Sequence, residues 1–235
     1  MDSGEDGLLK AMKNSKTANV IFRAELHSEQ NLAEPWPPKR MQHPLFLWLG
    51  LRPVIAQHTR MEHETLQRWA SNRRQVVEIG VAEGASALAL REVMAADGTL
   101  YLIDPFHLSR IKWINSQRHA ASAAVGRSDN GQVVWIEEFS FDAVRDWTKS
   151  IDFLFIDGDH DEKAVRQDWE AWHNFVAPGG CVAFHDARQF ANGWPTATDG
   201  PVRVVNALFR ENPVRDWKIV EEADSLVVVQ RSAEC

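Results

Sequence analysis

Short apolar runs alternate along most of the chain with longer stretches in which apolar residues recur at helical spacing. The apolar runs predict strands at 76–80, 99–104, 132–137, 151–157, 181–185, 217–222 and 225–231. The stretches around them predict helices at 59–72, 85–96, 109–124, 141–148, 161–176 and 201–211. Strands that alternate with helices form parallel β-α-β units, and runs without polar interruption are typical of a sheet buried on both faces.

The last two predicted strands are separated only by Ala223-Asp224. So short a link allows an antiparallel hairpin, whereas a parallel pair needs a crossover of about a dozen residues or more. We therefore predict an α/β fold with a doubly wound, Rossmann-like seven-stranded sheet, mostly parallel, with one antiparallel strand near the C-terminus. Residues 1–58 lack the alternation and contain Pro35, Pro37 and Pro38, so they are predicted to form a helical arm or lid ahead of a domain at 59–235.

Local signals refine two of the helices. Thr59 is a candidate N-cap and Glu62 follows it at the spacing of a capping box. In the helix after the fourth strand, Trp169 and Trp172 share one apolar stripe and are predicted core residues. Pro178-Gly179-Gly180 is predicted to end that helix and to turn the chain into the fifth strand.

A glycine-containing turn follows the first predicted strand. It reads Glu78-Ile79-Gly80-Val81-Ala82-Glu83-Gly84, and the second strand ends in Asp104. In doubly wound folds such a turn faces an adenine nucleoside, whose ribose hydroxyls bind the acid after the second strand. Dinucleotide binders need G-x-G-x-x-G to approach a pyrophosphate, whereas the spacing here is G-x-x-x-G with an acid just before it. A carboxylate in this crevice favours a cationic ligand, so S-adenosylmethionine, a sulfonium with an ammonium group on an adenosine, is the predicted cofactor.

Other residues near the predicted crevice are candidate cofactor contacts. Ser86, at the start of the helix after the turn, can cap that helix or bind the methionine carboxylate together with neighbouring N–H groups. Phe139-Ser140-Phe141 follows the third strand and can flank an adenine with two rings and a hydroxyl. Burial in the core is the more common fate of phenylalanine.

The densest group of ionisable residues is Asp157-Gly158-Asp159-His160-Asp161, and the next strand ends in His185-Asp186. Neighbouring parallel strands would bring Asp157 close to Asp186, and two such carboxylates repel each other unless a cation lies between them. We therefore predict a divalent metal, with Mg²⁺ as the expected ion, on Asp157, Asp186 and His185. Nitrogen suits Zn²⁺ or Mn²⁺ better than Mg²⁺. His160 is placed to take a proton from a hydroxyl and is the candidate general base. Either Asp159 or Asp161 is predicted to cap the following helix.

Composition narrows the range of partners. The 33 acidic residues outnumber the 26 basic ones, and the net charge of −7 argues against a nucleic-acid partner. The longest apolar stretch, 44–51, is far shorter than the roughly 20 residues of a membrane span, and the acidic first residues lack the order of a signal peptide. Cys181 lies in an apolar run and is a predicted core residue, while Cys235 ends the chain. We expect a cytoplasmic protein that acts on a small molecule, binds no membrane and forms a homo-oligomer.

These motifs together make the chain resemble a class I S-adenosylmethionine-dependent methyltransferase. It is most similar to the metal-dependent small-molecule O-methyltransferases, including catechol O-methyltransferase-like and macrolide-sugar enzymes. The resemblance covers about residues 60–231, through VVEIGVAEGAS, LIDP, FLFIDGDH, PGGCVAFHD and the closing hairpin. His185 departs from the pattern, because the sugar enzymes tend to have a second aspartate there and the catechol enzymes a small residue.

The resemblance implies a role for each matching residue. The methionine part would contact Glu78, Gly80, Gly84 and Ser86, the ribose Asp104, and the adenine Phe139, Ser140 and Phe141. Asp157, a candidate cofactor contact and catalytic residue as well, and Asp186 match the family's metal ligands, and His160 matches its base.

The implied function is metal-assisted transfer of a methyl group from S-adenosylmethionine to a hydroxyl of a small molecule, such as a natural product or a sugar. The metal would lower the pKa of the hydroxyl, His160 would accept the proton, and the oxygen would attack the sulfonium methyl in line. Arg188, Phe190, Trp194 and the arm are candidate acceptor contacts. The alternatives are a metal-independent N- or C-methyltransferase acting on a small molecule, a non-catalytic nucleoside-binding domain and a nicotinamide dehydrogenase, which the glycine spacing disfavours.

Overall fold

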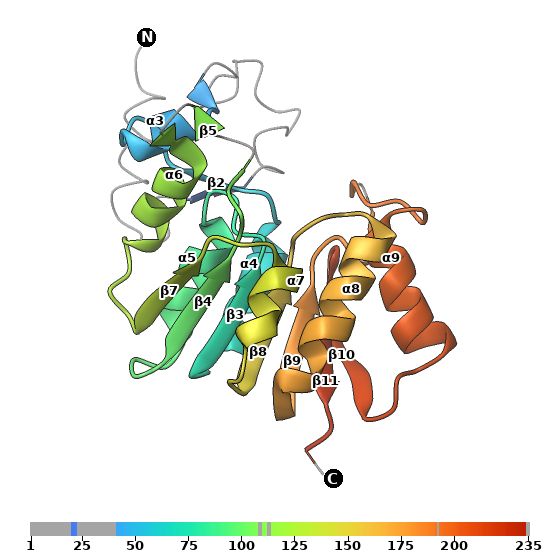
Figure 1. Ribbon diagram of the computed structural model, residues 1–235. Helices are drawn as coiled ribbons and strands as arrows, with labels where there is room; N and C mark the ends of the chain where they lie inside the picture. Colours follow the sequence, from blue (N-terminus) through green and yellow to red (C-terminus); the bar gives the residue numbers. More distant parts are fainter. Residues whose placement is uncertain (1–19, 23–40, 108–109, 112–113, 192, 234–235) are drawn as a thin grey trace.

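The computed structural model describes residues 20–22, 41–107, 110–111, 114–191 and 193–233 (Figure 1). Seven strands form the main sheet in the order β10-β11-β9-β8-β3-β4-β7. Their bounds are β3 Gln75–Ile79, β4 Thr99–Ile103, β7 Gln132–Ile136, β8 Ile151–Ile156, β9 Val176–Phe184, β10 Trp217–Ala223 and β11 Leu226–Arg231. Only β11 runs antiparallel to its neighbours, β9 and β10. It lies between these two strands, and β10 forms the edge of the sheet. The predicted doubly wound, mostly parallel sheet is confirmed.

Helices cover both faces of the sheet, as Figure 1 shows with α8 in front of the strands. One layer contains α4 Arg60–Ala70, α5 Ala85–Val93 and α6 Ser116–Val125. The other contains α7 Ser140–Ala143, α8 Glu162–Trp172 and α9 Gly200–Val205, with 3-10 turns at Val144–Asp146 and His173–Phe175 and a π-helical turn at Asn206–Glu211. None of the described helices has the length and apolar character that a bilayer crossing requires.

The core follows the alternation of side chains along the central strands. In β3, Val77 and Ile79 pack into the layer of α8, whereas Val76 packs into the layer of α4 and α5. Trp169 and Trp172 are buried on α8, and Cys181 is buried in β9, so these three predictions are confirmed. The central strands are therefore apolar on both faces of the sheet. Most of the polar residues predicted to form the site follow the ends of these strands.

Two local predictions are wrong. The first residues of the helix predicted at 109–124 form strands instead: Arg110–Ile111 (β5) and Ile114–Asn115 (β6) pair antiparallel. Helix α6 begins only at Ser116, where the side chain of Asn115 accepts the N–H of Arg118. Pro178-Gly179-Gly180 lies within β9 and not in a turn before it, since α8 already ends at Trp172. Gly180 packs so closely that an added Cβ would lie 2.7 Å from Val176 Cγ1.

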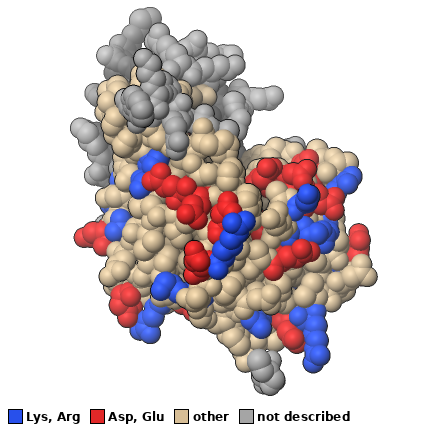
Figure 2. Space-filling view, viewed as in Figure 1, with Lys and Arg blue, Asp and Glu red and all other residues tan. Residues whose placement is uncertain are grey.

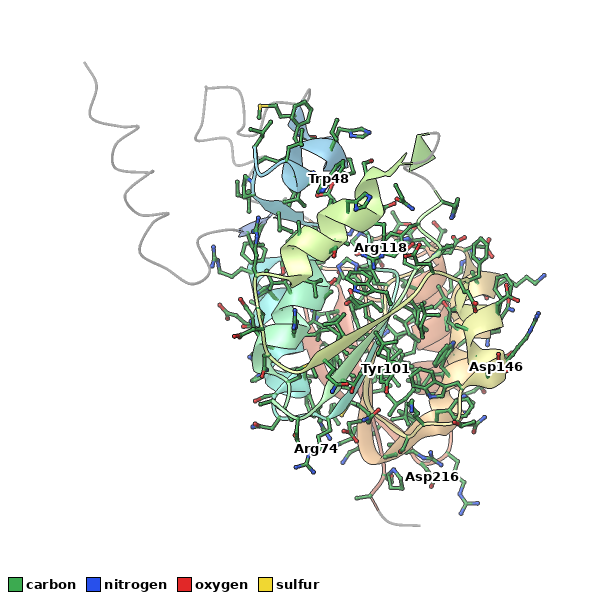
Figure 3. All side chains as sticks on the ribbon, turned by 60° about the vertical axis from the view of Figure 1, so that its left-hand side comes forward. Trp48, Arg74, Tyr101, Arg118, Asp146 and Asp216 are labelled. Carbon is green, nitrogen blue, oxygen red and sulfur yellow. The ribbon has the colours of Figure 1, made fainter. Side chains whose placement is uncertain are left out.

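The described part of residues 1–58 packs beside the glycine turn. Val20–Phe22 (β1) pairs parallel with Val54–Ala56 (β2), and the short helix α3, Pro44–Trp48, packs on α6. The Trp48 ring stacks on His119 of α6 at 4.6 Å, and Figure 3 shows Trp48 at the end of the molecule opposite Arg74 and Asp216. The predicted role as a helical arm or lid stays a prediction, and Pro35, Pro37, Pro38 and Cys235 lie outside the described residues.

Candidate active site

A pocket of about 630 Å³ opens at the carboxyl ends of β3, β4 and β8. This volume lies within the range of about 300–1,000 Å³ that is typical of small-molecule sites. Of the predicted cofactor contacts, the pocket wall includes Gly80, Asp104, Phe139, Ser140, Phe141 and Asp157, and the candidate base His160 lies in the same wall. Residues from four separate strand ends therefore meet in one cavity, as expected for ligand sites in doubly wound sheets.

The glycine turn needs its two glycines for different reasons. Gly80 has φ 85°, and an added Cβ would lie 2.0 Å from the carbonyl oxygen of Asp157, so only glycine lets the turn approach the end of β8. Gly84 has φ 81° and is the N-cap of α5, where an added Cβ would lie 3.2 Å from Ala121 Cα on α6. Ala82 also has a positive φ, 48°, which marks this turn as strained.

Asp104 holds the turn in place. Its Oδ2 accepts hydrogen bonds from the backbone N–H groups of Val81 and Ala82 at 2.9 and 3.1 Å, and its Oδ1 accepts the N–H of Phe106 at 2.7 Å. These three hydrogen bonds fix the position of the carboxylate against the turn. Each carboxylate oxygen can accept more than one hydrogen bond, so Asp104 can still bind ribose hydroxyls from the pocket side.

Glu78 and Ser86 lie behind the turn and not in the pocket wall. Glu78 is fully buried in β3, where its Oε1 accepts the hydroxyl hydrogen bond of Ser86, while its Oε2 has no partner among the described residues. Burial raises the pKa of Glu78 well above its usual range, and the carboxylates of Asp157 and Asp104 raise it further. Ser86 is not the cap of α5, since Gly84 occupies that position. The negative charge at the mouth therefore comes from Asp104 and Asp157.

An aromatic pair, Phe139 and Phe141, borders the pocket after the end of β7. The rings of Phe139 and Phe141 stack with centroids 5.2 Å apart, and their side chains are 45% and 40% exposed. Phe139 is the N-cap of the short helix α7, and Ser140 is the first residue of that helix. These phenylalanines are exposed in the pocket, contrary to their usual fate in the core, and a flat ring can lie against them.

The ionisable cluster after β8 and β9 is connected by hydrogen bonds. His185 Nδ1 lies 2.9 Å from Asp157 Oδ1, and His160 Nε2 lies 2.8 Å from Asp186 Oδ2. The other oxygen of Asp186 accepts hydrogen bonds from the Trp194 indole N–H and the Ser225 hydroxyl. Asp161, and not Asp159, caps α8. The structure thus brings the predicted base and the predicted metal ligands together in one group.

Hydrogen bonds and charges within the cluster shift the pKa values of His160, Asp186 and His185. The hydrogen bond from His160 to Asp186 is the main cause that raises the pKa of His160. Burial would raise the pKa of Asp186, but its bonds to His160 and Trp194 and the nearby His185 charge outweigh burial and lower it. For His185, burial lowers the pKa, yet the carboxylates of Asp157, Glu62 and Asp186 prevail and raise it well above its ordinary value.

Glu62 is a member of this cluster that the sequence did not reveal. The predicted capping box is confirmed, because Glu62 Oε2 accepts the N–H of Thr59 at 2.7 Å. The same Oε2 lies 3.5 Å from His185 Nε2, and Oε1 accepts both the N–H and the hydroxyl of Ser225. Glu62 and His185 are far apart in the sequence and no local pattern links them, so only the fold shows their contact.

The donor atoms fit a divalent ion. Ligand atoms of Asp157, His160 and His185 all lie within 4.8 Å of one another, and the second nitrogen of His185 faces Glu62 as metal-bound histidines face a carboxylate. Two imidazoles and one carboxylate suit Mn²⁺, Fe²⁺ or Zn²⁺ better than Mg²⁺. In this arrangement Asp186 orients His160, whereas the sequence predicted Asp186 itself as a ligand.

An ion pair joins the described part of the arm to the glycine turn. Arg52 NH2 lies 2.6 Å from Glu83 Oε1 within the turn, and the Arg52 side chain is fully buried. Burial raises the pKa of Glu83 in spite of this pair.

On the face shown in Figure 2, acidic and basic side chains are interspersed, without an extended basic area.

Comparison with known proteins places this site in a class. Residues 77–187 match the profile of a family described as a methyltransferase domain. That segment runs from the glycine turn to the residue after Asp186. Together with the doubly wound sheet, this match supports the prediction of a methyltransferase, and S-adenosylmethionine as the methyl donor belongs to the function proposed below.

Solved structures share the fold at low identity. A protein from Corynebacterium glutamicum superposes with a TM-score of 0.58 at 16% identity, over 77% of this chain and 84% of that one. The O-methyltransferase TomG from Streptomyces achromogenes, involved in tomaymycin synthesis and solved with S-adenosylmethionine, gives 0.55 at 16% identity, over 80% and 87%. A putative rRNA methylase from Clostridium thermocellum gives 0.54 at 12% identity, over 72% and 95%. At such identities the likeness shows the fold and not the acceptor.

Proposed function

We propose that this enzyme transfers the methyl group of S-adenosylmethionine to a hydroxyl of a small molecule, with His160 as the general base. The observation that carries the proposal is the pair of His160 and Asp186 at the wall of the pocket that Gly80 and Asp104 border. An imidazole held by a carboxylate beside a nucleoside-sized pocket is suited to removing a proton from a bound hydroxyl.

The pocket can hold each part of the donor. Asp104 would accept the ribose hydroxyls, and the adenine would lie against Phe139 and Phe141. The methionine part would lie along the turn at Gly80, where Asp157 supplies negative charge for the sulfonium. Glu78 and Ser86 would act from behind the turn, where the hydrogen bond between their side chains joins β3 to α5.

The chain's own residues would accept the proton that the reaction releases. With Nε2–H of His160 bonded to Asp186, Nδ1 carries the lone pair that accepts the hydroxyl proton. The oxygen forms a bond to the methyl carbon as the carbon–sulfur bond breaks, so S-adenosylhomocysteine leaves as a neutral thioether. Asp186 stabilises the imidazolium that results. General-base assistance of this kind is worth about 10²–10⁴ in rate.

A divalent ion would be held by Asp157 and His185, with Glu62 orienting the imidazole of His185. When bound, such an ion lowers the pKa of a hydroxyl that it contacts. His160 is the third donor within reach, and it cannot serve as ligand and base through the same nitrogen.

The acceptor would lie beside the loop after β9. Trp194 is 43% exposed while its indole N–H is bonded to Asp186, and Phe190 packs edge-on against it. These rings provide an apolar wall next to His160. The net charge of −7 disfavours RNA as the acceptor, so we favour a neutral or cationic small molecule with a hydroxyl.

A second candidate is the same transfer without a metal. The raised pKa of His185 makes its imidazolium the cation between Asp157, Asp186 and Glu62, so the carboxylates are already compensated. Nothing in the cluster favours N- or C-methylation over O-methylation.

The test is a methyl-transfer assay with isotopically labelled S-adenosylmethionine and a panel of hydroxyl, amine and activated-carbon acceptors. We expect label in a hydroxyl acceptor, and loss of transfer in His160→Gln. Label that enters only amines or carbon acceptors would contradict the proposal. A rate that persists in EDTA would select the second candidate.

A further inference from the structure

Asp168 is a buried acid in the pocket wall that none of the roles above uses. It lies on α8, its side chain is 6% exposed, and it borders the cavity together with Ser140 and Gly158. Its Oδ1 accepts a hydrogen bond from the hydroxyl of Ser140. Its Oδ2 points toward Gly158, where an added Cβ would lie 3.6 Å away, and no donor in the described part of the chain bonds to it.

The surroundings of Asp168 disfavour its charged form. Burial raises the pKa of Asp168 to about 6, and the carboxylate of Asp159 adds to the rise while the Ser140 bond opposes it. No basic side chain among the described residues forms an ion pair with Asp168. Asp168 borders the open pocket, so a donor from a bound ligand that reaches this second oxygen would stabilise the carboxylate.

The surroundings specify what kind of ligand that is. Ser140 is the residue between Phe139 and Phe141 in the sequence, and its hydroxyl donates a hydrogen bond to Asp168 next to this stacked pair. A purine that lies against these rings presents its edge to the same corner of the pocket. Adenine carries an exocyclic amino group, a donor, where guanine and hypoxanthine carry a carbonyl, an acceptor.

We propose that Asp168 is the residue that selects adenine, by accepting a hydrogen bond from the exocyclic amino group at Oδ2 while Ser140 fixes the carboxylate through Oδ1. A purine with a carbonyl at that position brings an acceptor against the carboxylate and is rejected. This inference rests on the proposed function, because the adenine belongs to the S-adenosylmethionine that function requires. It adds a residue on α8 to a subsite that the sequence placed only on 139–141.

A merely structural role for Asp168 is the competing explanation. The Asp168–Ser140 bond also joins α8 to the short helix α7, and losing it would loosen both. Such a role predicts weaker binding of every purine derivative by the same factor. Recognition of the amino group instead predicts a change in the ratio of two affinities, which loss of stability alone does not produce.

The experiment compares two ligands that differ at one position of the base. S-Adenosylhomocysteine and S-inosylhomocysteine are titrated calorimetrically into the full chain, into Asp168→Asn, and into Glu170→Gln as the control. Glu170 is an exposed acid on the same helix, so the control removes the same charge away from the pocket. Thermal melting of each variant establishes that it is folded.

We expect the wild-type protein to prefer S-adenosylhomocysteine by at least about tenfold, the discrimination typical of base-edge hydrogen bonds. In Asp168→Asn the amide can offer either its oxygen or its N–H groups, so the preference should fall to within about threefold. Glu170→Gln should keep the wild-type ratio. A ratio in Asp168→Asn that equals the wild-type ratio, or a wild-type protein that binds both ligands equally, would overturn the inference and leave the proposed function intact. A wild-type protein that binds neither ligand would overturn the proposed function as well.

Discussion

The imidazole of His160 and the carboxylate of Asp186 lie 2.8 Å apart, although they follow two different strands, β8 and β9. Parallel pairing of these strands places both residues at one edge of the sheet, with Ile156 opposite Phe184. Asp186 has a left-handed backbone, φ 51°, an uncommon conformation outside glycine. The pair lies between the pocket and the loop that contains Trp194, which is where the proposed function requires a base.

Activity should depend on the ionisation of His160. Only the neutral imidazole accepts a proton, and the bond to Asp186 raises the pKa of His160 above its ordinary 6.5. The rate at saturating substrate should therefore rise with pH through this raised pKa. In Asp186→Asn the rate should fall, and its rising limb should move toward lower pH. A limb that stays in place would show that another group titrates. For stability the sign is opposite: the contribution of the pair is full below 6.5 and is lost as pH rises through the raised pKa.

Removing the base should affect chemistry and spare binding. His160→Gln should lower kcat by about 10²–10⁴ while the affinity for S-adenosylhomocysteine stays within about threefold. His119→Gln is the matched control, because His119 is exposed on α6 and stacks on Trp48 outside the pocket. Steady-state kinetics and calorimetry give both quantities. Full activity in His160→Gln would remove the histidine from the mechanism.

Asp104 should contribute to both the ligand and the turn. Asp104→Ala removes the acceptor for ribose and also the acceptor of the N–H groups of Val81, Ala82 and Phe106. We expect the affinity for S-adenosylhomocysteine to fall about 10–100-fold, since a hydrogen bond to a charged group is worth about 1.5–3 kcal/mol. Melting should also fall by several degrees, and more than in Asp104→Asn, whose amide oxygen keeps part of the turn's bonds. A variant with wild-type affinity would place the ribose elsewhere.

The elements that could be predicted from sequence are those with uninterrupted apolar patterns. The strands at 99–103 and 151–156 lie almost where the pattern placed them, because a strand buried on both faces contains few polar residues. The pattern failed ahead of α6, where the short strands Arg110–Ile111 and Ile114–Asn115 pair antiparallel instead of continuing the helix. It also failed at 178–180, where a proline and two glycines continue a strand.

The candidate site could be predicted only in part. Asp157, His160 and Asp186 stand directly at strand ends, so strand order alone brings them together. The position of Glu78 could have been inferred, since an acid inside a doubly buried strand has to be buried itself. The contacts of Glu62 with His185 and of Asp168 with Ser140 join helices to the site across the chain. Such contacts depend on how helices pack and leave no local signature.

The buried contact between Glu62 and His185 should be a main source of stability in this cluster. Their side chains are 0% and 3% exposed, and removing one partner of a buried ion pair costs about 3–5 kcal/mol. Glu62→Gln should lower the free energy of unfolding by about this amount, measured by urea denaturation at pH 7. Glu64→Gln, an exposed acid on the same helix, should change it by less than about 0.5 kcal/mol.

The pH dependence of that loss has a definite sign. Burial would raise the pKa of Glu62, but the nearby His185 and the hydrogen bonds from Ser225 and Thr59 outweigh burial and lower it below 4.5. Its contribution is therefore present above 4.5 and is lost as pH falls through the lowered pKa. The difference between wild type and Glu62→Gln should shrink on acidification. An unchanged difference would mean that the charge of Glu62 plays no part.

Metal binding should follow the donor set. Protein dialysed against EDTA should bind Mn²⁺ more tightly than Mg²⁺, because two of the three converging donors are imidazoles. His185→Ala should lose this binding, and titration calorimetry measures it without reference to activity. Tighter binding of Mg²⁺, or binding that survives in His185→Ala, would assign the ion to other residues.

The central claim is that the pocket bounded by Gly80, Asp104 and Phe139 binds S-adenosylmethionine. Calorimetric titration of the wild-type chain with S-adenosylhomocysteine, alongside NAD at the same concentrations, tests it most directly. We predict saturable one-to-one binding of S-adenosylhomocysteine, weakened in Asp104→Ala, and no binding of NAD. Binding of NAD alone, or of neither ligand, would contradict the claim.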